Sequence, residues 1–456
     1  MTSKVIVVGG GYAGVSAATS LAEQGFQVDL LESRGSLGGR VYSTAPSESF
    51  PAPVDNGPHL FMGCYHETLR LFARLNVPGP FHWVDPLGLY WLDPGGKKLS
   101  LKCAPLPSPL HLAFGLLTTN AFPFPEKILL ARALGVFSKK PFKLPSGMET
   151  VAQFLDHSGQ GPYSRERFWI PICNAVMNVS PATAPIQGLG EVLKRMFFGS
   201  RRDSAVAIAA QPLSGVGFPQ VEEFLKTRGG TVSFHEGVQG FNAGSKNFEL
   251  NTRSGKTYTG DSLIWAVPPS SLSLLWPKGN WPAVEALPRL GKSPILSVHV
   301  ILSKTVMDEH FAGLPGANFE WVFNRNKNWG WHPAPQNLGG GEGQAQYLSF
   351  TASAADKLAK QTEKELVDLA LKELKDRCPA ARDAQVLHAK VTREMAATFI
   401  WNKETDRLRP GPETPFPQVF LAGDWTNTGL PATIEGACLS GHRAAEKVRE
   451  YLGKNK

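Results

Sequence analysis

The chain has 456 residues, more than one ordinary domain, so we expect two lobes. Apolar residues make up 42% and charged residues 19% of it, a composition that is typical of globular proteins and excludes a disordered chain. The net charge of +8 is compatible with acidic partners. No basic stripe with interleaved aromatic residues accompanies that charge, so we expect no nucleic-acid partner.

Cysteine usage and hydropathy narrow the class of protein further. Five well-separated cysteines form no CxxC pair, which argues against a disulfide framework and against a metal site. The first residues do not show the pattern of a secretory signal peptide, a charged segment followed by an apolar one, so we do not expect secretion. The longest uncharged stretch, residues 103–125, contains five prolines, so we do not expect it to cross a bilayer. We therefore expect a cytoplasmic protein without a bound metal.

The first thirty residues predict a strand, a helix and a second strand. Lys4–Val8 is a short β-branched run, Val15–Gln24 has helical periodicity up to Gly25, and Phe26–Leu31 is again strand-like. Three glycines in GxGxxG spacing follow the first strand: Gly9, Gly11 and Gly14. This order of elements is typical of a dinucleotide-binding βαβ unit.

Each residue of this motif has a physical task. Gly9 makes the tight turn, Gly11 lets the backbone approach a pyrophosphate, and Gly14 lets the helix pack closely on the strand. Glu32 ends the second strand, where a carboxylate accepts hydrogen bonds from the adenosine ribose and disfavours a 2′-phosphate. The motif leaves open whether the dinucleotide is NAD or FAD.

The next segment favours FAD. Gly38-Gly39-Arg40 resembles the extension found in FAD proteins of the amine oxidase and carotenoid desaturase superfamily. In that superfamily the extension runs along the pyrophosphate and the flavin, so the resemblance implies cofactor contacts from Arg34, Gly39 and Arg40. An ordinary glycine turn is the alternative interpretation.

A second cofactor segment is predicted near the carboxyl end. Val419–Ala422 is a short buried-strand pattern that ends in Gly423-Asp424, and residues 429–437 form a loop that enters the last helix. The partial positive charge of that helix N-terminus suits the pyrimidine edge of a reduced flavin. Resemblance to the closing motif of the superfamily implies that Asp424 binds the ribityl chain and that Thr433 and Ile434 border the flavin. Because residues 424–433 contain no cysteine, we expect non-covalent FAD.

The middle of the chain contributes one more predicted contact. Thr231–Phe241 is similar to a strand pair of the superfamily, with Val238 where the backbone meets the adenine. Phe248–Gly260 predicts a hairpin. Gly255-Lys256-Thr257 is similar to the tail of a P-loop, but Leu250 occupies the position of the first required glycine, so we reject a second nucleotide site there. Gly339–Gly343 is likewise a loop without strand and helix context.

The expected fold class is α/β, with a Rossmann-like FAD-binding domain of the glutathione-reductase type and a discontinuous mixed α+β substrate domain. We assign residues 1–74, 212–286 and 391–456 to the first domain, and residues 75–211 and 287–390 to the second. Aromatic residues of the second domain either line an apolar pocket or form plain core. They are Phe168, Trp169, Phe197, Phe198, Phe319, Trp321, Phe323, Trp329 and Trp331.

Several segments together resemble one family, the hydroxysqualene dehydroxylases of hopanoid-producing bacteria. The segments are Asp55-Asn56-Gly57-Pro58-His59, Gly63-Cys64-Tyr65, Thr68–Leu75, Pro105–Leu117, Phe168-Trp169 with Pro171, and Gly429–Ala437. The resemblance implies that a C30 polyisoprenoid alcohol loses its hydroxyl group and receives hydride from reduced FAD, which gives squalene. The chain departs from the family at Pro58, where the family usually has Gln.

Loss of a hydroxyl group needs a proton donor with a pKa near neutrality, and His59 is our candidate. We expect Gly57 and Leu60 to contact the isoalloxazine through the backbone. A carotenoid or phytoene-type desaturase is the first alternative. A flavin amine oxidase is the second, with Lys292 as its N5 lysine. The third is a non-enzymatic flavoprotein that serves as a scaffold for neighbouring prenyl-transfer enzymes.

The segment Cys103–Phe142 has a second interpretation beside that of a lid over the core. It mixes prolines with apolar residues, predicts an amphipathic helix over Glu126–Phe137, and continues into Lys139-Lys140. Such a segment can lie on a membrane surface and admit lipid. It therefore predicts peripheral contact with the inner face of the cell membrane.

Overall fold

The amino-terminal residues form the strand, helix and strand that the sequence predicts. The computed structural model describes residues 2–79, 81–244, 247–332 and 345–454. Helix α1 (Tyr12–Glu23) joins β1 (Lys4–Val8) to β2 (Gln27–Leu31), and the two strands are parallel neighbours. The helix begins before Val15, our predicted start, because Gly14 packs inside its first turn despite its low helix propensity.

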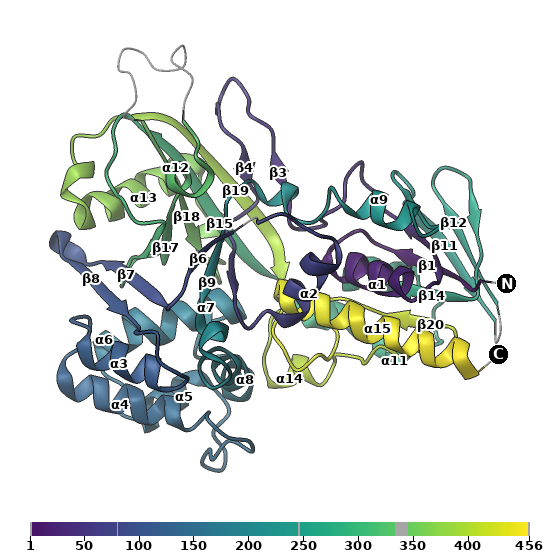
Figure 1. The fold of residues 1–456 in the computed structure, drawn as a ribbon, viewed down its shortest axis with the longest axis horizontal. Helices are drawn as coiled ribbons and strands as arrows, with labels where there is room; N and C mark the ends of the chain where they lie inside the picture. The colour runs from purple at the N-terminus through teal and green to yellow at the C-terminus, as the bar shows by residue number, and fades with distance from the viewer. Residues whose placement is uncertain (1, 80, 245–246, 333–344, 455–456) are drawn as a thin grey trace.

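Five parallel strands form the sheet of the first lobe, on the right in Figure 1. In spatial order they are β10 (Thr231–Ser233), β2, β1, β14 (Ser262–Trp265) and β20 (Val419–Leu421). All five carboxyl ends lie at one edge, the edge at which open parallel sheets bind their ligands. The sheet thus brings the two predicted cofactor segments to the same edge, although they lie at opposite ends of the chain.

Helices from both ends of the chain cover this sheet. α15 (Ile434–Lys454) packs directly against α1 (Figure 1), and a Cβ on Gly441 would lie 2.1 Å from the carbonyl oxygen of Ala13. Glycine at this position therefore permits the close approach. The other elements of the lobe are α2 (His66–Arg74), α9 (Val221–Lys226), α10 (Pro269–Leu275), α11 (Pro282–Glu285), α14 (Lys403–Asp406), and the antiparallel strands β11 (Val238–Ala243), β12 (Phe248–Thr252) and β13 (Thr257–Tyr258).

The second lobe contains a seven-stranded sheet. Its strands in spatial order are β19 (Val386–Thr398), β15 (Ser293–Leu302), β18 (Gln346–Ala352), β17 (Trp321–Asn324), β16 (Phe311–Gly313), β7 (Gly88–Leu92) and β8 (Lys98–Lys102). Leu296, Val298 and Val300 belong to the core that packs on α13 (Glu363–Arg377). Because side chains alternate along a strand, Ser297 and His299 lie on the opposite face. That face is turned toward the rest of the molecule.

Helices complete the second lobe, at the lower left of Figure 1. They are α3 (Leu110–Thr118), α4 (Phe124–Gly135), α5 (Val151–His157), α6 (Pro162–Ser164), a π-helical turn (Arg165–Trp169), α7 (Ile170–Met177) and α8 (Ile186–Phe197). α4 lies two residues N-terminal to the predicted helix. Short strands connect the lobes: β3 (Ser43–Thr44), β4 (Val54–Asp55), β5 (Leu60–Met62), β6 (Phe81–Val84) and β9 (Val206–Ala209). The short helix α12 (Arg325–Trp329) follows β17 directly and packs on β18 within the second lobe.

Two observations bear on the predicted domain limits, which remain a prediction. The limit between residues 390 and 391 falls inside β19, and β5 of the first domain pairs with β9 of the second. The predicted loop Gly339–Gly343 lies outside the described residues. Among the helices that the structure describes, none combines the length and the apolar character that crossing a membrane requires.

Candidate functional site

The three glycines of the first turn have different surroundings. Gly9 has a φ of +110°, and a Cβ on it would lie 2.4 Å from the Ala266 carbonyl oxygen. A Cβ on Gly14 would lie 1.9 Å from the Gly9 oxygen, so glycine alone lets α1 pack this close to the turn. A Cβ on Gly11 would meet, among the described residues, only Gly39 Cα at 3.9 Å. The backbone at Gly11 is thus open at a helix N-terminus, where a pyrophosphate fits.

Glu32 is held rigidly at the end of β2. It is buried, Oε2 accepts a hydrogen bond from Gly10 N at 2.7 Å, and Oε1 accepts one from Arg34 N at 2.8 Å. Oε1 also accepts a hydrogen bond from Ser33 Oγ at 3.1 Å. A carboxylate has about four acceptor positions, so Oε2 retains capacity for a ribose hydroxyl. Arg34 Nη1 in turn donates to Gly39 O at 2.9 Å. Arg34 therefore supports the Gly38-Gly39-Arg40 extension directly.

Arg40 connects the two predicted cofactor segments. Its Nη2 lies 2.7 Å from Asp424 Oδ2, and its Nη1 donates to Ala397 O at 2.6 Å. The charge of Asp424 raises the pKa of Arg40. The structure therefore brings Arg40 and Asp424 together, as a shared cofactor site requires, although sequence reasoning gave no reason to pair them with each other.

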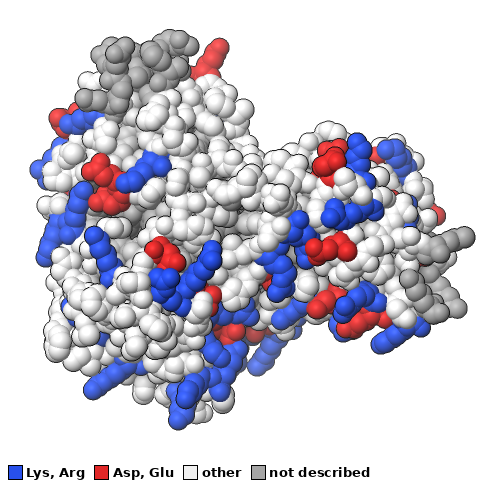
Figure 2. Space-filling model, in the orientation of Figure 1, with Lys and Arg blue, Asp and Glu red and all other residues white. Residues whose placement is uncertain are grey.

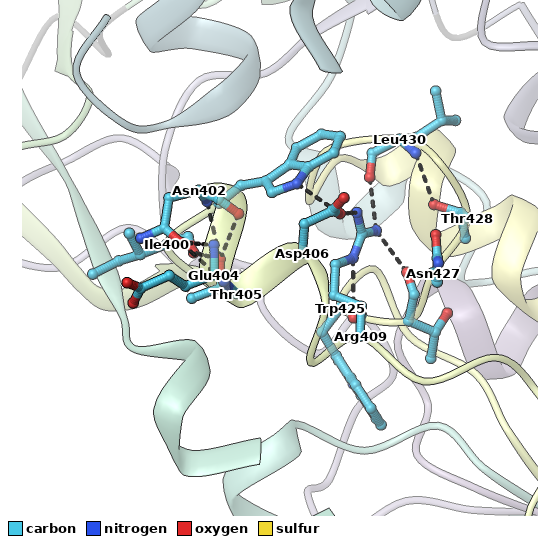
Figure 3. A network of polar contacts seen from close by, with 12 residues as sticks. Ile400, Asn402, Glu404, Thr405, Asp406, Arg409, Trp425, Asn427, Thr428 and Leu430 are labelled. Carbon is cyan, nitrogen blue, oxygen red and sulfur yellow. Dashed lines mark hydrogen bonds and ion pairs between the residues drawn. The ribbon is translucent and has the colours of Figure 1, made fainter. Parts of the chain in front are cut away.

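Arg409 holds the loop that follows Asp424 (Figure 3). Its Nη2 donates to Thr426 O at 2.6 Å and to Leu430 O at 2.8 Å, and its side chain is fully buried. The guanidinium also lies over the rings of Phe399 and Trp401, with its carbon 4.9 and 4.8 Å from the ring centroids. Sequence reasoning missed Arg409, because an arginine in a proline-rich loop carries no local signal for burial.

The loop ends at the N-cap of α15. Thr433 Oγ1 accepts a hydrogen bond from Gly436 N at 3.1 Å, and helix α15 then begins at Ile434. The Glu435 side chain bonds to α2 instead of the predicted flavin site: its carboxylate accepts hydrogen bonds from Glu67 N and Thr68 N at 3.1 and 3.0 Å. Glu435 thereby caps α2 and ties this helix to the loop.

Residues 53–57 lie across the open face of the seven-stranded sheet. Tyr347 Oη donates to the carbonyl oxygen of residue 53 at 3.1 Å, and Thr392 Oγ1 donates to that of residue 56 at 2.9 Å. A Cβ on Gly57 would lie 3.5 Å from Ser297 Oγ. The predicted isoalloxazine contact Gly57 therefore sits directly against β15, and Leu60 begins β5 just beyond it.

Three buried polar groups form a row across this face. The register pairs Ser297 of β15 with Thr351 of β18, and Thr351 with Trp321 of β17. Directly opposed residues point to the same face of a sheet. Ser297 Oγ, Thr351 Oγ1 and Trp321 Nε1 are all buried without a hydrogen-bond partner among the described residues. Unpaired buried polar groups are costly, so a row of three beside Gly57 indicates an oxygen-containing ligand or water.

The surroundings of His59 correct one prediction. Burial and the nearby guanidinium groups of Arg325 and Arg40 lower the pKa of His59 to about 4. Arg325 Nη2 is itself held 3.3 Å from Asp55 Oδ2, and both side chains are buried. The prediction of a general acid with a near-neutral pKa is wrong on this point, because the site favours the neutral imidazole.

Other predicted residues lie as follows. Val238 begins β11, is half-buried, and pairs with Thr252, which leaves its predicted adenine contact a prediction. Lys292 is exposed before β15, which does not suit a lysine buried at flavin N5. Cys438 is fully buried within α15. Most of the candidate pocket aromatics are core residues of the second lobe: Phe168, Trp169, Phe197, Phe319, Trp321 and Phe323.

These residues together fit FAD. The open turn at Gly11 suits the pyrophosphate, Glu32 suits a ribose, and the capped N-terminus of α15 suits the electron-rich end of the flavin. No cluster of three or more His, Cys, Asp or Glu side chains in the described part of the chain could hold a metal ion.

Comparison with known proteins shows the family of this chain. The family described as flavin-containing amine oxidoreductase matches residues 12–449. Hydroxysqualene dehydroxylases from Rhodopseudomonas palustris and Sinorhizobium fredii are 28% and 26% identical to this chain; the matches cover 98% of this chain and, respectively, 99% and 98% of the relatives. A 15-cis-phytoene desaturase from an Oncidium hybrid cultivar is 25% identical over 99% of this chain and 78% of its own length.

Solved structures show the same fold. An oxidoreductase from Methanosarcina mazei superposes with a TM-score of 0.73 at 15% identity, and the match covers 97% of this chain and 100% of that one. A putrescine oxidase bound to putrescine gives 0.70 at 14% identity over 99% of both chains. The predicted fold class is thereby confirmed.

Proposed function

Since the chain belongs to the flavin-containing amine oxidoreductase family and FAD is its cofactor, we propose that it converts hydroxysqualene to squalene by reductive dehydroxylation. The observation that carries this proposal is the match to two hydroxysqualene dehydroxylases over almost the full length of both partners.

The reaction replaces a carbon–oxygen bond by a carbon–hydrogen bond. When reduced FAD is bound, it supplies the hydride for the allylic carbon. The leaving oxygen takes up a proton and departs as water, and a reductant from outside the chain must return two electrons for the next turnover. The protein therefore has to bind the hydroxyl group, admit one proton from solvent to the leaving oxygen, and keep bulk water away from the allylic carbon.

The unpaired row on the seven-stranded sheet is the place we propose for the hydroxyl group. Ser297, Thr351 and Trp321 can each donate one hydrogen bond to an oxygen. His59 remains our candidate for a catalytic role, now as a neutral hydrogen-bond donor instead of a protonated acid. Faces of Trp321 and Phe323 on the same sheet can stabilise an allylic cation.

A single-turnover experiment tests the reaction. Holoprotein is photoreduced without oxygen and mixed with hydroxysqualene; we expect the flavin to reoxidise and squalene to appear, as measured by absorbance at the flavin band and by mass spectrometry. No reoxidation and no squalene would refute the proposal. Bleaching of the oxidised flavin by a simple amine would instead favour an amine oxidase.

A desaturase is the second candidate, because the phytoene desaturase from Oncidium matches 99% of this chain. A desaturase would remove hydrogen from its substrate, so phytoene should bleach the oxidised flavin anaerobically. In our proposal, phytoene leaves the oxidised flavin unchanged.

Substitutions in the row test the proposed hydroxyl site. For Thr351→Val and Ser297→Ala we expect kcat/KM for hydroxysqualene to fall by about tenfold, because one hydrogen bond to the leaving oxygen is lost. Thr351→Ser keeps the hydroxyl group and is the control, which should retain most of the activity. Equal loss in Thr351→Ser and Thr351→Val would point to a packing role instead.

A further inference from the structure

Exposed apolar side chains gather on two helices of the second lobe. Ten large apolar residues are exposed in the described part of the chain, and six of them fall between residues 106 and 128. We call these six the α3–α4 apolar face: Leu106, Leu110, Phe114, Leu117, Phe124 and Ile128. Scattered apolar residues on a surface are ordinary, but a contiguous group usually marks an interaction site.

Helix geometry explains why these side chains share one surface. Leu110, Phe114 and Leu117 are spaced i, i+4 and i+7 along α3, while Leu112 and Leu116 on its other side are buried. α4 packs against α3 and starts with an exposed phenylalanine. The most exposed members are Leu117 at 67% and Phe124 at 65%. Both helices therefore turn apolar side chains to solvent as well as to the core.

Basic residues lie close to this face along the chain. Residues 101–148 contain six basic residues and one acidic residue. The acidic one, Glu126, is partly buried and accepts a hydrogen bond from Ser164 N at 2.7 Å. Figure 2 shows this part of the molecule, at its lower left, as mostly white with blue along its lower edge. The basic residues are Lys102, Lys127, Arg132, Lys139, Lys140 and Lys143, of which Lys140 forms an ion pair with Glu191 on α8.

We propose that the α3–α4 apolar face docks on an anionic phospholipid membrane. Leucine and phenylalanine side chains enter the acyl boundary, while the flanking lysines contact phosphate and carboxylate headgroups. Protein interfaces are depleted in lysine, so a lysine-bordered apolar face fits a bilayer better than a protein partner. Docking here is independent of the reaction proposed above, and failure of one leaves the other intact.

Vesicle sedimentation of the FAD-loaded protein tests the docking. We expect binding to vesicles of phosphatidylcholine with about one-third phosphatidylglycerol, and at least about tenfold weaker binding to phosphatidylcholine alone. The triple variant Leu110→Ser, Phe114→Ser and Leu117→Ser should bind the anionic vesicles at least about tenfold more weakly. Retained flavin absorbance and an unchanged Tm show that this variant is folded.

Leu274→Ser is the matched control, because Leu274 is 85% exposed but lies on α10 in the other lobe. It should bind vesicles like the parent. The proposal is overturned if the parent does not bind anionic vesicles, or if the control loses as much binding as the triple variant. It is also overturned if the face instead buries itself in a second copy, seen as a dimer by light scattering that the triple variant abolishes.

Discussion

Gly11 and Gly14 lie three residues apart, yet a methyl group should act differently at each. For Gly14→Ala we expect a Tm at least about 3 °C lower with or without FAD, since the Cβ would overlap the Gly9 carbonyl. For Gly11→Ala we expect the apoprotein Tm to stay within about 1 °C and FAD affinity to fall by about tenfold or more. Fluorescence titration with FAD and thermal melts separate the two effects. An unchanged FAD affinity in Gly11→Ala would contradict the pyrophosphate site.

Substitutions of two buried titratable residues should change the pH dependence of the Tm in opposite directions. Burial raises the pKa of Glu320 to about 7 from its ordinary value of 4.5, so the fold loses stability as the pH rises through that window. The Tm of Glu320→Gln minus that of the parent should therefore increase by about 2 °C or more from pH 5 to pH 8.

His299 provides the contrast. Burial and nearby positive charges lower its pKa well below 6.5, so the unfolded chain takes up a proton that the fold does not accept. The parent loses this stability as the pH falls below 6.5. The Tm of His299→Gln minus that of the parent should then increase from pH 7.5 to pH 5.5. A Glu320→Gln difference that does not grow toward high pH would contradict the first assignment, and a His299→Gln difference that does not grow toward low pH would contradict the second.

At the level of elements, one side chain organises the cofactor loop before α15. For Arg409→Ala we expect the Tm to fall by roughly 3 °C or more, because the backbone acceptors at Thr426 and Leu430 lose their buried donor. FAD affinity should weaken with it, since this loop connects Asp424 to Thr433. Arg407→Ala is the control, because Arg407 is exposed two residues away and should behave like the parent. Equal effects of the two substitutions would refute this role.

The elements themselves followed from the sequence where local signals were strong. The β-branched run before Gly9 and the final helix after Thr433 are where their patterns predict them, and the helix between β1 and β2 ends within one residue of its predicted end. The start of α1 was misjudged, because close packing of Gly14 on the turn overrides its poor helix propensity. Hydrogen bonds between elements, such as those of Glu435 to α2, have no such pattern.

At the scale of the whole molecule, bound FAD should contact segments that are distant in the chain and thereby stabilise the fold. The predicted contacts come from residues 9–60, from Val238 and from residues 423–434, and the sheet and the Arg40–Asp424 pair bring the first and last of these segments together. Adding FAD to the apoprotein at about a hundredfold excess over its Kd should raise the Tm by about 3 °C in one transition. Thermal melts followed by intrinsic fluorescence measure this. If the purified protein is colourless and its Tm does not change when FAD is added, the cofactor assignment is contradicted.

The sequence by itself determined the class of fold and the presence of a dinucleotide site. GxGxxG spacing, a terminal acid and a β-branched strand act within thirty residues, and their conformational preferences are local, so they can be recognised without a structure. The family resemblance favoured FAD over NAD and added the remote cofactor segment at Gly423-Asp424.

Only the tertiary structure decided how the proposed flavin and substrate site is built. The pairing of Arg40 with Asp424, the burial of Arg409, the low pKa of His59 and the row from Ser297 to Trp321 all join residues that are far apart in the chain. Burial and electrostatic interaction depend on distance in space, and sequence separation does not encode that distance.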